Sequence, residues 1–234
     1  MVPIIVCGGD EAGRGAILGP LVISLVSIKK SSLSRLSEAG VRDSKLLSPK
    51  KRGTLYNTIK KIAADVRVDC IFPSEINDAM KNGISLNELE AVHFARLFDT
   101  IDQDISAVYL DSPDVIAEKF GIRFNMSSSK PTKVVGAKAI KVTEGKKTRI
   151  IAEHKADSRY PVVSAASIIA KVTRDHEVKK LERTLGITIG SGYPSDDTTI
   201  DAIKENMENA LLFENTRKYW RTMDRIKQTR LTSF

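Results

Sequence analysis

Cysteine and histidine are scarce in this chain. Its 234 residues include 2 Cys and 3 His, and Cys7 and Cys70 lie too far apart to form a CxxC pair. Two isolated thiols are typical of unpaired cysteines in a reducing compartment. The histidines have no spacing that would pair them on a metal, so we do not expect zinc. His93 shares a helical face with leucines, which favours the core or its rim, whereas the roles of His154 and His176 stay open.

Long apolar runs are also missing. No stretch approaches the roughly 18 apolar residues that a membrane-spanning helix needs. The opening MVPIIVCGG lacks the basic segment of a secretory signal. We therefore expect a soluble, cytoplasmic protein.

Negative charge is in deficit. Lys and Arg total 37 and Asp and Glu total 29, which leaves a net charge of +8. Such a balance suits a polyanionic partner, most commonly nucleic acid, although a merely soluble basic surface would give the same count. The length and a hydrophobic content of 41% predict one large domain, alone or with a small appendage.

Predicted strands and helices alternate along most of the chain. Ser48 before Pro49, and Ser85 three residues before Glu88, are typical helix starts. Apolar runs predict strands at 3–9, 18–28, 66–72 and 107–111, a hairpin joining the first two strands, a further hairpin within 133–152, and a long helix at 161–185. This order predicts a mixed α/β sheet with helices packed on it, and a boundary near residue 190 before a helical remainder.

Acidic residues stand at the ends of these elements. Asp10 and Glu11 follow the first apolar run, Asp111 ends the run AVYLD, and Asp157 directly precedes the long helix. Neighbouring side chains of a continuing strand point to opposite faces, so Asp10 and Glu11 can share a site only if the strand stops there. The glycines of the following GRG would allow that stop. Ligands commonly bind at such strand ends in open α/β sheets.

Each acid also has a purely structural explanation. Asp157 could cap the helix that begins at Pro161, Asp111 could start the turn DSPD, and Glu11 could pair with Arg14. Taken singly, these explanations are the better ones. Four converging carboxylates, however, would repel each other unless cations neutralised them, and ligands that are all oxygens favour Mg²⁺ or Mn²⁺, which process phosphodiesters.

Two common phosphate-binding motifs are excluded by spacing. Gly13, Gly15 and Gly19 give GxGxxxG instead of the dinucleotide-binding GxGxxG, and Pro20 stands where a Walker motif needs lysine. A glycine turn with exposed N–H groups and a guanidinium is still suited to gripping a sugar-phosphate backbone.

Six segments together resemble ribonuclease HII, the type 2 ribonuclease H. They are GGDEAGRG, VRDSKLLSPKKR, YLDSPD, HKADSRYPVVSAASIIAKVTRD, GSGYPSD and RKYWRT, and they span about residues 4–222. The RKYWRT ending is similar to the archaeal form. The resemblance implies a ribonuclease H-like fold with a five-stranded mixed sheet flanked by helices, formed by residues 1–190, and a C-terminal helical region at 191–234.

The resemblance also implies the functional residues. Asp10, Glu11, Asp111 and Asp157 would hold two Mg²⁺ or Mn²⁺ ions, with Asp10 bridging them. The remaining implied contacts are Gly13, Arg14 and Gly15 with the ribonucleotide, Tyr193 with the sugar that follows it, and Ser44, Lys45, Ser167, Lys171 and Arg174 with phosphates. For Tyr193 the structural alternative is packing beneath the GSGYP turn, and for the basic residues it is a solvated surface. The segment from Ser127 to Arg149 is longer and richer in lysine than the family pattern, which puts the pairing of that strand in doubt.

The implied activity is two-metal hydrolysis of RNA in RNA/DNA hybrids, and cleavage on the 5′ side of single ribonucleotides in duplex DNA, by a monomer. The products would carry a 3′-hydroxyl and a 5′-phosphate. Two alternatives stay open: a related nuclease that acts on DNA alone, and a nucleic-acid-binding protein without chemistry.

The last residues, QTRLTSF, suggest a partner. Gln228, Leu231 and Phe234 are spaced by three and would form one stripe in a 3₁₀ turn. The pattern resembles the motif with which replication and repair enzymes bind a sliding clamp, although that motif usually ends in two aromatic residues. A frayed chain end is the alternative.

Overall fold

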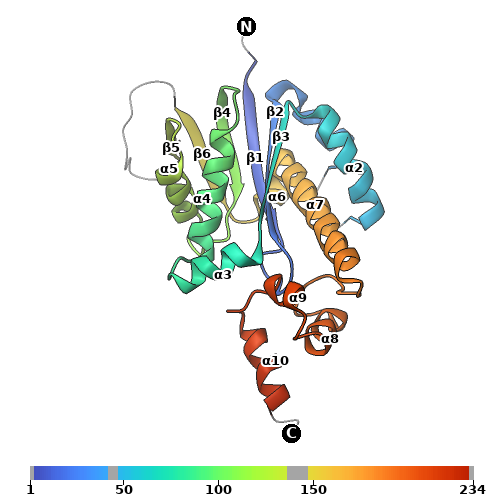
Figure 1. Ribbon diagram of the computed structural model, residues 1–234. Helices are drawn as coiled ribbons and strands as arrows, with labels where there is room; N and C mark the ends of the chain where they lie inside the picture. Colours follow the sequence, from blue (N-terminus) through green and yellow to red (C-terminus); the bar gives the residue numbers. More distant parts are fainter. Residues whose placement is uncertain (1–2, 42–46, 136–146, 232–234) are drawn as a thin grey trace. The chain divides into compact units, whose positions relative to one another are not determined.

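The computed structural model describes residues 3–41, 47–135 and 147–231 (Figure 1). Its contacts group into two compact units. The first unit comprises Met1–Glu11, Ile23–Asp69 and Asn87–Val172, and the second unit comprises Ala12–Val22, Cys70–Leu86 and Thr173–Phe234. The expected boundary near residue 190 falls inside the second unit, and a functional division there stays a prediction.

The sheet has six strands in the described residues, in the order β3-β2-β1-β4-β6-β5, and not the expected five. The strands are β1 (Ile5–Ala12), β2 (Leu21–Lys29), β3 (Asp65–Ile71), β4 (Ile105–Asp111), β5 (Thr132–Val134) and β6 (Thr148–Glu153). β1 and β2, which were expected to form a hairpin, are neighbours in the sheet. The hairpin predicted within 133–152 is wrong, because β5 and β6 pair in parallel and the strands of a hairpin run antiparallel.

Two helices begin where their capping residues predict. Ser48 accepts a hydrogen bond from the Lys51 N–H and Pro49 opens α2, while α4 starts directly after Ser85. The helical segments are η1 (Lys30–Ser32), α1 (Leu33–Glu38), α2 (Pro49–Ile62), α3 (Pro73–Lys81), α4 (Leu86–Asp99), α5 (Ala117–Ser127), α6 (Ala156–Arg159), α7 (Pro161–Leu185), α8 (Asp197–Glu205), α9 (Ala210–Glu214) and α10 (Arg221–Leu231). No helix among the described residues is both long and apolar enough to cross a bilayer.

In the first unit, helices cover both faces of the sheet. One face packs against α1, α2 and the start of α7, and its apolar cluster includes Val6, Val26 and Val163. A side chain at Gly8 would lie 2.4 Å from the Val162 carbonyl carbon, so glycine lets α7 approach β1 closely. On the other face, a side chain at Gly9 would meet Phe94 of α4 at 3.1 Å. Both strand glycines therefore serve close packing.

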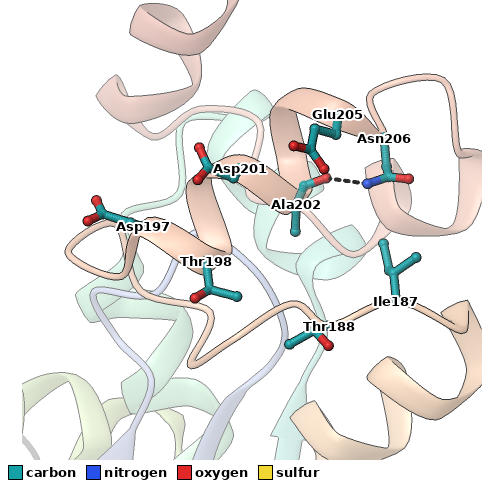
Figure 2. Close-up of a pocket in the computed structure, with 8 residues that line it drawn as sticks. All are labelled: Ile187, Thr188, Asp197, Thr198, Asp201, Ala202, Glu205 and Asn206. Carbon is teal, nitrogen blue, oxygen red and sulfur yellow. Dashed lines mark hydrogen bonds between the residues drawn. The ribbon is translucent and has the colours of Figure 1, made fainter.

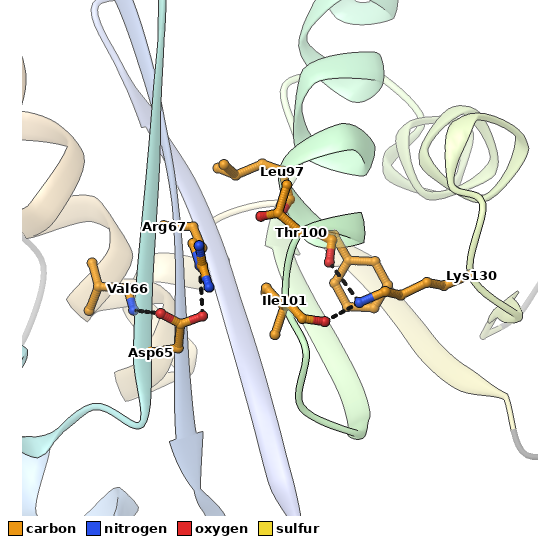
Figure 3. Close-up of polar contacts among 8 residues, drawn as sticks. Asp65, Val66, Arg67, Leu97, Thr100, Ile101 and Lys130 are labelled. Carbon is orange, nitrogen blue, oxygen red and sulfur yellow. Dashed lines mark hydrogen bonds and ion pairs between the residues drawn. The ribbon is translucent and has the colours of Figure 1, made fainter.

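Polar contacts join the C-terminal end of α4 to Lys130 (Figure 3). Thr100 Oγ1 donates to the Leu97 carbonyl at 2.7 Å. Lys130 Nζ donates to the carbonyls of Phe98 and Ile101 and lies 5.1 Å from the centre of the Phe98 ring. A cation suits the last carbonyls of a helix. The same figure draws Asp65, which begins β3 and accepts from the Val66 N–H at 2.9 Å and from Arg67 Nε at 2.8 Å.

The second unit has its own core. The unit includes residues 12–22, α3, the end of α7 and helices α8 to α10. Its buried cluster consists of Ile17, Leu18, Val178, Ile189, Ala202, Ile203, Leu212, Met223 and Ile226. Asn77 of α3 joins the segment before α10 by donating to the Thr216 carbonyl at 2.9 Å and accepting from the Lys218 N–H at 2.8 Å.

Candidate active site

Asp10 and Asp111 occupy neighbouring parallel strands of the first unit. Gly9 pairs with Leu110, so the next residues along the two strands, Asp10 and Asp111, are adjacent. Side chains alternate along a strand, which places Asp10 on the same face as Gly8, the face that packs against α7. The strand does not stop at Asp10 as expected, because β1 continues to Ala12, yet the Glu11 side chain still reaches the Asp10 carboxyl and shares a hydrogen bond with it. The Glu11 N–H also donates to Asp10 Oδ1 at 2.8 Å, which orients the Asp10 carboxylate.

Asp157 comes from the turn between β6 and α7. Lys155 has φ of 56°, a left-handed conformation that L residues rarely adopt, and α6 follows it directly. The Ala156 N–H donates to Asp111 Oδ1 at 2.7 Å, and the Ser164 hydroxyl donates to the Asp157 carbonyl. These bonds tie the turn to the end of β4 on one side and to α7 on the other.

The three aspartates form a compact acidic group. One carboxylate oxygen each from Asp10, Asp111 and Asp157 lies within 4.8 Å of the others, and Asp10 and Asp157 are each only 4% exposed. Burial raises the pKa of Asp10 well above its usual range, and the charges of Glu11 and Asp111 raise it further, while a hydrogen bond from Ser167 opposes the rise. Such an all-oxygen cluster could bind a metal ion, and a cation would relieve the repulsion.

The GRG turn, residues 13–15, belongs to the second unit, and its two glycines differ. Gly13 has φ of +94°, and a Cβ there would lie 2.3 Å from Arg174 Nε and 2.8 Å from the Pro20 carbonyl oxygen. Gly15 has no such requirement: it is exposed, and a Cβ there would meet nothing within 4 Å. Internal packing and the positive φ therefore require glycine at position 13, whereas nothing in the described residues requires glycine at position 15.

Arg174 is buried, whereas a phosphate contact was expected of it. The side chain is 1% exposed, and its guanidinium donates to the carbonyls of Ser191 at 3.0 Å and Leu18 at 3.3 Å. The guanidinium carbon also lies 4.5 Å from the centre of the Tyr193 ring, at cation–π distance. Burial lowers the pKa of Arg174. This geometry favours a structural role for Arg174, which braces Tyr193.

The loop that carries Tyr193 is closed by backbone hydrogen bonds. Asp196 accepts from the Ser191 N–H at 2.6 Å and the Thr198 N–H at 3.1 Å, which lowers the pKa of its carboxyl. The Gly192 carbonyl accepts from the N–H groups of Ile17 and Leu18, at 2.8 and 3.1 Å. The Tyr193 loop and the loop of residues 12–22 are thus bonded to each other within the second unit.

The other expected contacts have different outcomes. Ser167 is buried beside Asp10, and Lys171 is half-buried one helical turn further along α7. Ser44, Lys45 and Phe234 lie outside the described residues. Gln228 is exposed, and α10 runs as an α-helix to Leu231, so the expected 3₁₀ turn does not begin at Gln228 in the free chain.

Two remaining features fall outside this group. His93 is buried, as expected, and its Nδ1 lies 2.8 Å from Asp69 Oδ2. A pocket of about 580 Å³ lies in the second unit, between α8 and residues 187–188. Figure 2 draws the residues that line it. Its lining includes Asp197, Asp201 and Glu205, whose negative charge would repel a nucleic-acid backbone.

Comparison with known proteins identifies relatives over nearly the full length. The family model for ribonuclease HII matches residues 7–223. Ribonuclease HII of Methanococcus maripaludis is 43% identical over 222 residues, 93% of this chain and 85% of the relative. The crystal structure of ribonuclease H2 from Pyrococcus horikoshii OT3 superposes with a TM-score of 0.81 at 36% identity and covers 97% of this chain and 98% of that one. The PCNA:RNase HII complex from Archaeoglobus fulgidus gives 0.77 at 33% identity over 93% and 96%.

The fold and these matches define a ribonuclease H, a nuclease of the hydrolase class. Within that class, the chain belongs to the ribonuclease HII family, and the relatives named above are archaeal, as the RKYWRT ending predicts. The activity that follows from the family is ribonuclease H endonuclease activity.

Proposed function

We propose that the chain hydrolyses the RNA strand of RNA/DNA hybrids and also cuts on the 5′ side of single ribonucleotides in duplex DNA, leaving a 3′-hydroxyl and a 5′-phosphate. The observation that carries this proposal is the buried group of Asp10, Asp111 and Asp157 at the strand ends. A basic protein concentrates negative charge there at an energetic cost, and holding cations against a phosphodiester explains that cost.

The donor set fits two Mg²⁺ or Mn²⁺ ions. The ligands would be Asp10, Asp111 and Asp157, which lie close together, and Glu11, which lies beside Asp10. Bound ions of this kind activate water and stabilise the leaving 3′-oxygen. Ser167 supports the arrangement, because its hydrogen bond to Asp10 favours the ionised carboxylate that a cation needs.

The ribonucleotide would be recognised through the GRG turn and Tyr193. The 2′-hydroxyl both donates and accepts hydrogen bonds and marks RNA within a DNA duplex. Gly15 is exposed and open, which suits close approach of a sugar to the backbone, and Arg14 supplies a cation beside it. Tyr193 is half-buried and braced by Arg174, which gives a firm aromatic surface for the following sugar.

Phosphate contacts would come from Ser44, Lys45 and Lys171. Lys171 is half-buried on α7, four residues after Ser167, so both side chains project from the same helical face. Arg174 is left out of this set because its guanidinium is buried on backbone carbonyls.

We also propose a sliding-clamp contact through Gln228, Leu231 and Phe234. The Archaeoglobus fulgidus relative has been solved in a complex with PCNA. Gln228 is exposed on α10, where a partner can reach it. Deleting residues 228–234 should leave cleavage of short duplexes intact and remove clamp binding in calorimetry. Unchanged clamp binding after the deletion would refute the contact.

The enzyme would act as a monomer in the cytoplasm, with residues 1–190 as the catalytic part and 191–234 as a helical region. Support for a reducing compartment comes from Cys7 and Cys70, which form no disulfide. Burial raises the pKa of the Cys7 thiol to about 12, so it stays protonated and unreactive.

The decisive experiment compares two duplexes that differ by one 2′-hydroxyl, with and without EDTA. We expect metal-dependent cleavage of the ribonucleotide-containing duplex alone, with product ends mapped to its 5′ side. Equal cleavage of the all-DNA duplex would favour a DNA nuclease, and cleavage in EDTA would refute the cation site.

A further inference from the structure

A second buried arginine holds the GRG turn from the C-terminal part of the second unit. Arg217 is 0% exposed. Its Nη1 donates to the Arg14 carbonyl at 2.8 Å, and its Nη2 donates to the Gly19 carbonyl at 3.3 Å. These two carbonyls belong to the first and last residues of the segment 14–19, so one side chain joins both ends of that segment.

The backbone around Arg217 is fixed in the same place. Its N–H donates to the Ile17 carbonyl at 2.8 Å, and the Gly19 N–H donates to the Asn215 carbonyl at 3.0 Å. Leu18 and Thr216 form an antiparallel bridge between these bonds. The guanidinium carbon lies 5.1 Å from the centre of the Trp220 ring, which favours one side-chain position. The pairing thus aims the guanidinium at the Arg14 carbonyl.

Holding the Arg14 carbonyl also orients the next amide. A peptide unit is planar and trans, so the Gly15 N–H points opposite to the Arg14 carbonyl oxygen. Arg217 takes that oxygen at 2.8 Å, and the Gly15 N–H therefore points away from the guanidinium. Hydrogen bonds from a charged donor are stronger than neutral ones, so the peptide is firmly held. Gly15 is the exposed glycine whose identity internal packing does not require.

We propose that Arg217 is a positioning residue for ribonucleotide selection, acting by fixing the direction of the Gly15 peptide. The inference rests on the proposed function, because it names what presents the turn to a 2′-hydroxyl. A hydroxyl of that kind is selected only if its partner is already oriented, and small misplacements of such groups can cost roughly 100-fold in rate.

The test compares Arg217→Met and Arg217→Lys with Met223→Ala, which removes a buried side chain of the same unit that lies in its apolar cluster. All are assayed well below their melting temperatures. Arg217→Met should lower kcat/KM on a single-ribonucleotide duplex by roughly 100-fold. Arg217→Lys should lose less, because an ammonium can still reach one carbonyl. Met223→Ala should keep its kcat/KM despite a comparable loss of stability. Equal activity losses in Arg217→Met and Met223→Ala would overturn the inference.

Two further readouts separate positioning from simple support. In a double-mutant cycle, Gly15→Ala and Arg217→Met should be non-additive, since both act on one peptide; additive losses would contradict the inference. Hydrogen exchange of residues 14–19 needs no substrate and should accelerate in Arg217→Met but not in Met223→Ala. If the wild-type protein leaves the duplex uncut, the proposed function fails and the role of Arg217 in selection fails with it. If the wild type cuts, equal exchange in the two variants would reject the inference alone.

Discussion

Asp10 and Asp111 take their positions from the sheet, whereas the GRG turn and Tyr193 take theirs from buried arginines. In the first unit, the ladder between β1 and β4 sets two like charges beside each other, and burial raises the pKa of Asp10. In the second unit, Arg174 and Arg217 donate to carbonyls of residues 12–22 and 191. The β1–β4 ladder holds carboxylates that repel one another. In the loops, by contrast, attractive bonds from arginine to carbonyl oxygens fix the backbone.

That contrast predicts opposite responses to substitution. Removing charge from the carboxylate group should harm activity without harming the fold, because the charges oppose one another. Removing Arg174 or Arg217 should harm both activity and the fold, because each guanidinium is bonded to backbone carbonyls of the loops.

The largest expected effect is that of Asp10→Asn and Asp111→Asn. Each removes a proposed cation ligand, so cleavage should fall to the level seen in EDTA. Each also reduces repulsion, so far-ultraviolet circular dichroism and melting temperature of the metal-free protein should be preserved or improved. Full activity in either variant would contradict the assignment.

The same group predicts a pH dependence of stability. A raised native pKa means that the folded state keeps a proton that the unfolded chain releases above about pH 4. The free energy of unfolding of the metal-free protein should therefore fall as pH rises from about 4 towards the raised native pKa of Asp10. Asp10→Asn should flatten this slope in urea titrations. If the free energy of unfolding of the wild type rose over this pH range, and Asp10→Asn showed the same slope, the raised pKa of Asp10 would not be the cause.

The two glycines of GRG should separate fold from function. Gly13→Ala forces a side chain into a left-handed conformation and against Arg174, which costs about 1–3 kcal/mol. Each kcal/mol lowers the melting temperature by about 2–4 °C in a chain of this size. Gly15→Ala should melt like the wild type and yet lose activity on the single-ribonucleotide duplex. Full activity in Gly15→Ala would show that its openness serves no ligand.

Tyr193 offers a sharper comparison within the loops. Tyr193→Ala removes the ring that Arg174 covers, and kcat/KM on a single ribonucleotide should fall more than binding does. Tyr193→Phe keeps the ring and should retain most of the activity, because stacking and the cation–π contact need no hydroxyl. Parallel losses of melting temperature and activity in Tyr193→Ala would favour a packing role instead.

The smallest expected effect concerns Lys171. Each phosphate neutralised contributes about −0.9 to the slope of log K against log salt on B-DNA. Lys171→Gln should make the measured slope shallower by about that amount. The control is Lys180→Gln on the same helix, where Lys180 Nζ lies 3.7 Å from Glu177 and the side chain is 70% exposed. Identical slopes in both variants would remove Lys171 from the interface.

Local signals in the sequence predicted α2, α4, α7, the helical remainder and the candidate cation group, whereas α1, α3, α5 and α6 were not predicted. Ser48 and Pro49 mark the start of α2, α7 has the expected bounds, and Asp111 ends β4. The parallel pairing of β5 with β6 was missed, because alternating β-formers specify a strand but not the direction of its neighbour. The stop expected at Asp10 was wrong for a related reason: glycines permit a turn, and the ladder decides where the strand ends.

The arginines show a different limit of sequence reasoning. Arg174 was expected at a phosphate because the family resemblance implied it, yet its guanidinium is buried on the carbonyls of Ser191, 17 positions away, and Leu18, 156 positions away. Arg217 is part of RKYWRT, but its hydrogen bond to Arg14 spans 203 positions. The local sequence offered only an arginine three residues before a tryptophan, and that does not identify a partner.

Calorimetric titration of Mn²⁺ into the wild-type protein and into Asp10→Asn tests the central claim most directly. Each protein is bound to the all-DNA duplex, which we expect neither protein to cut. Binding should be clear in the wild type and lost or strongly weakened in the variant, because Asp10 lies at the centre of the proposed ligands. Equal Mn²⁺ affinity and stoichiometry in the two proteins would contradict the account.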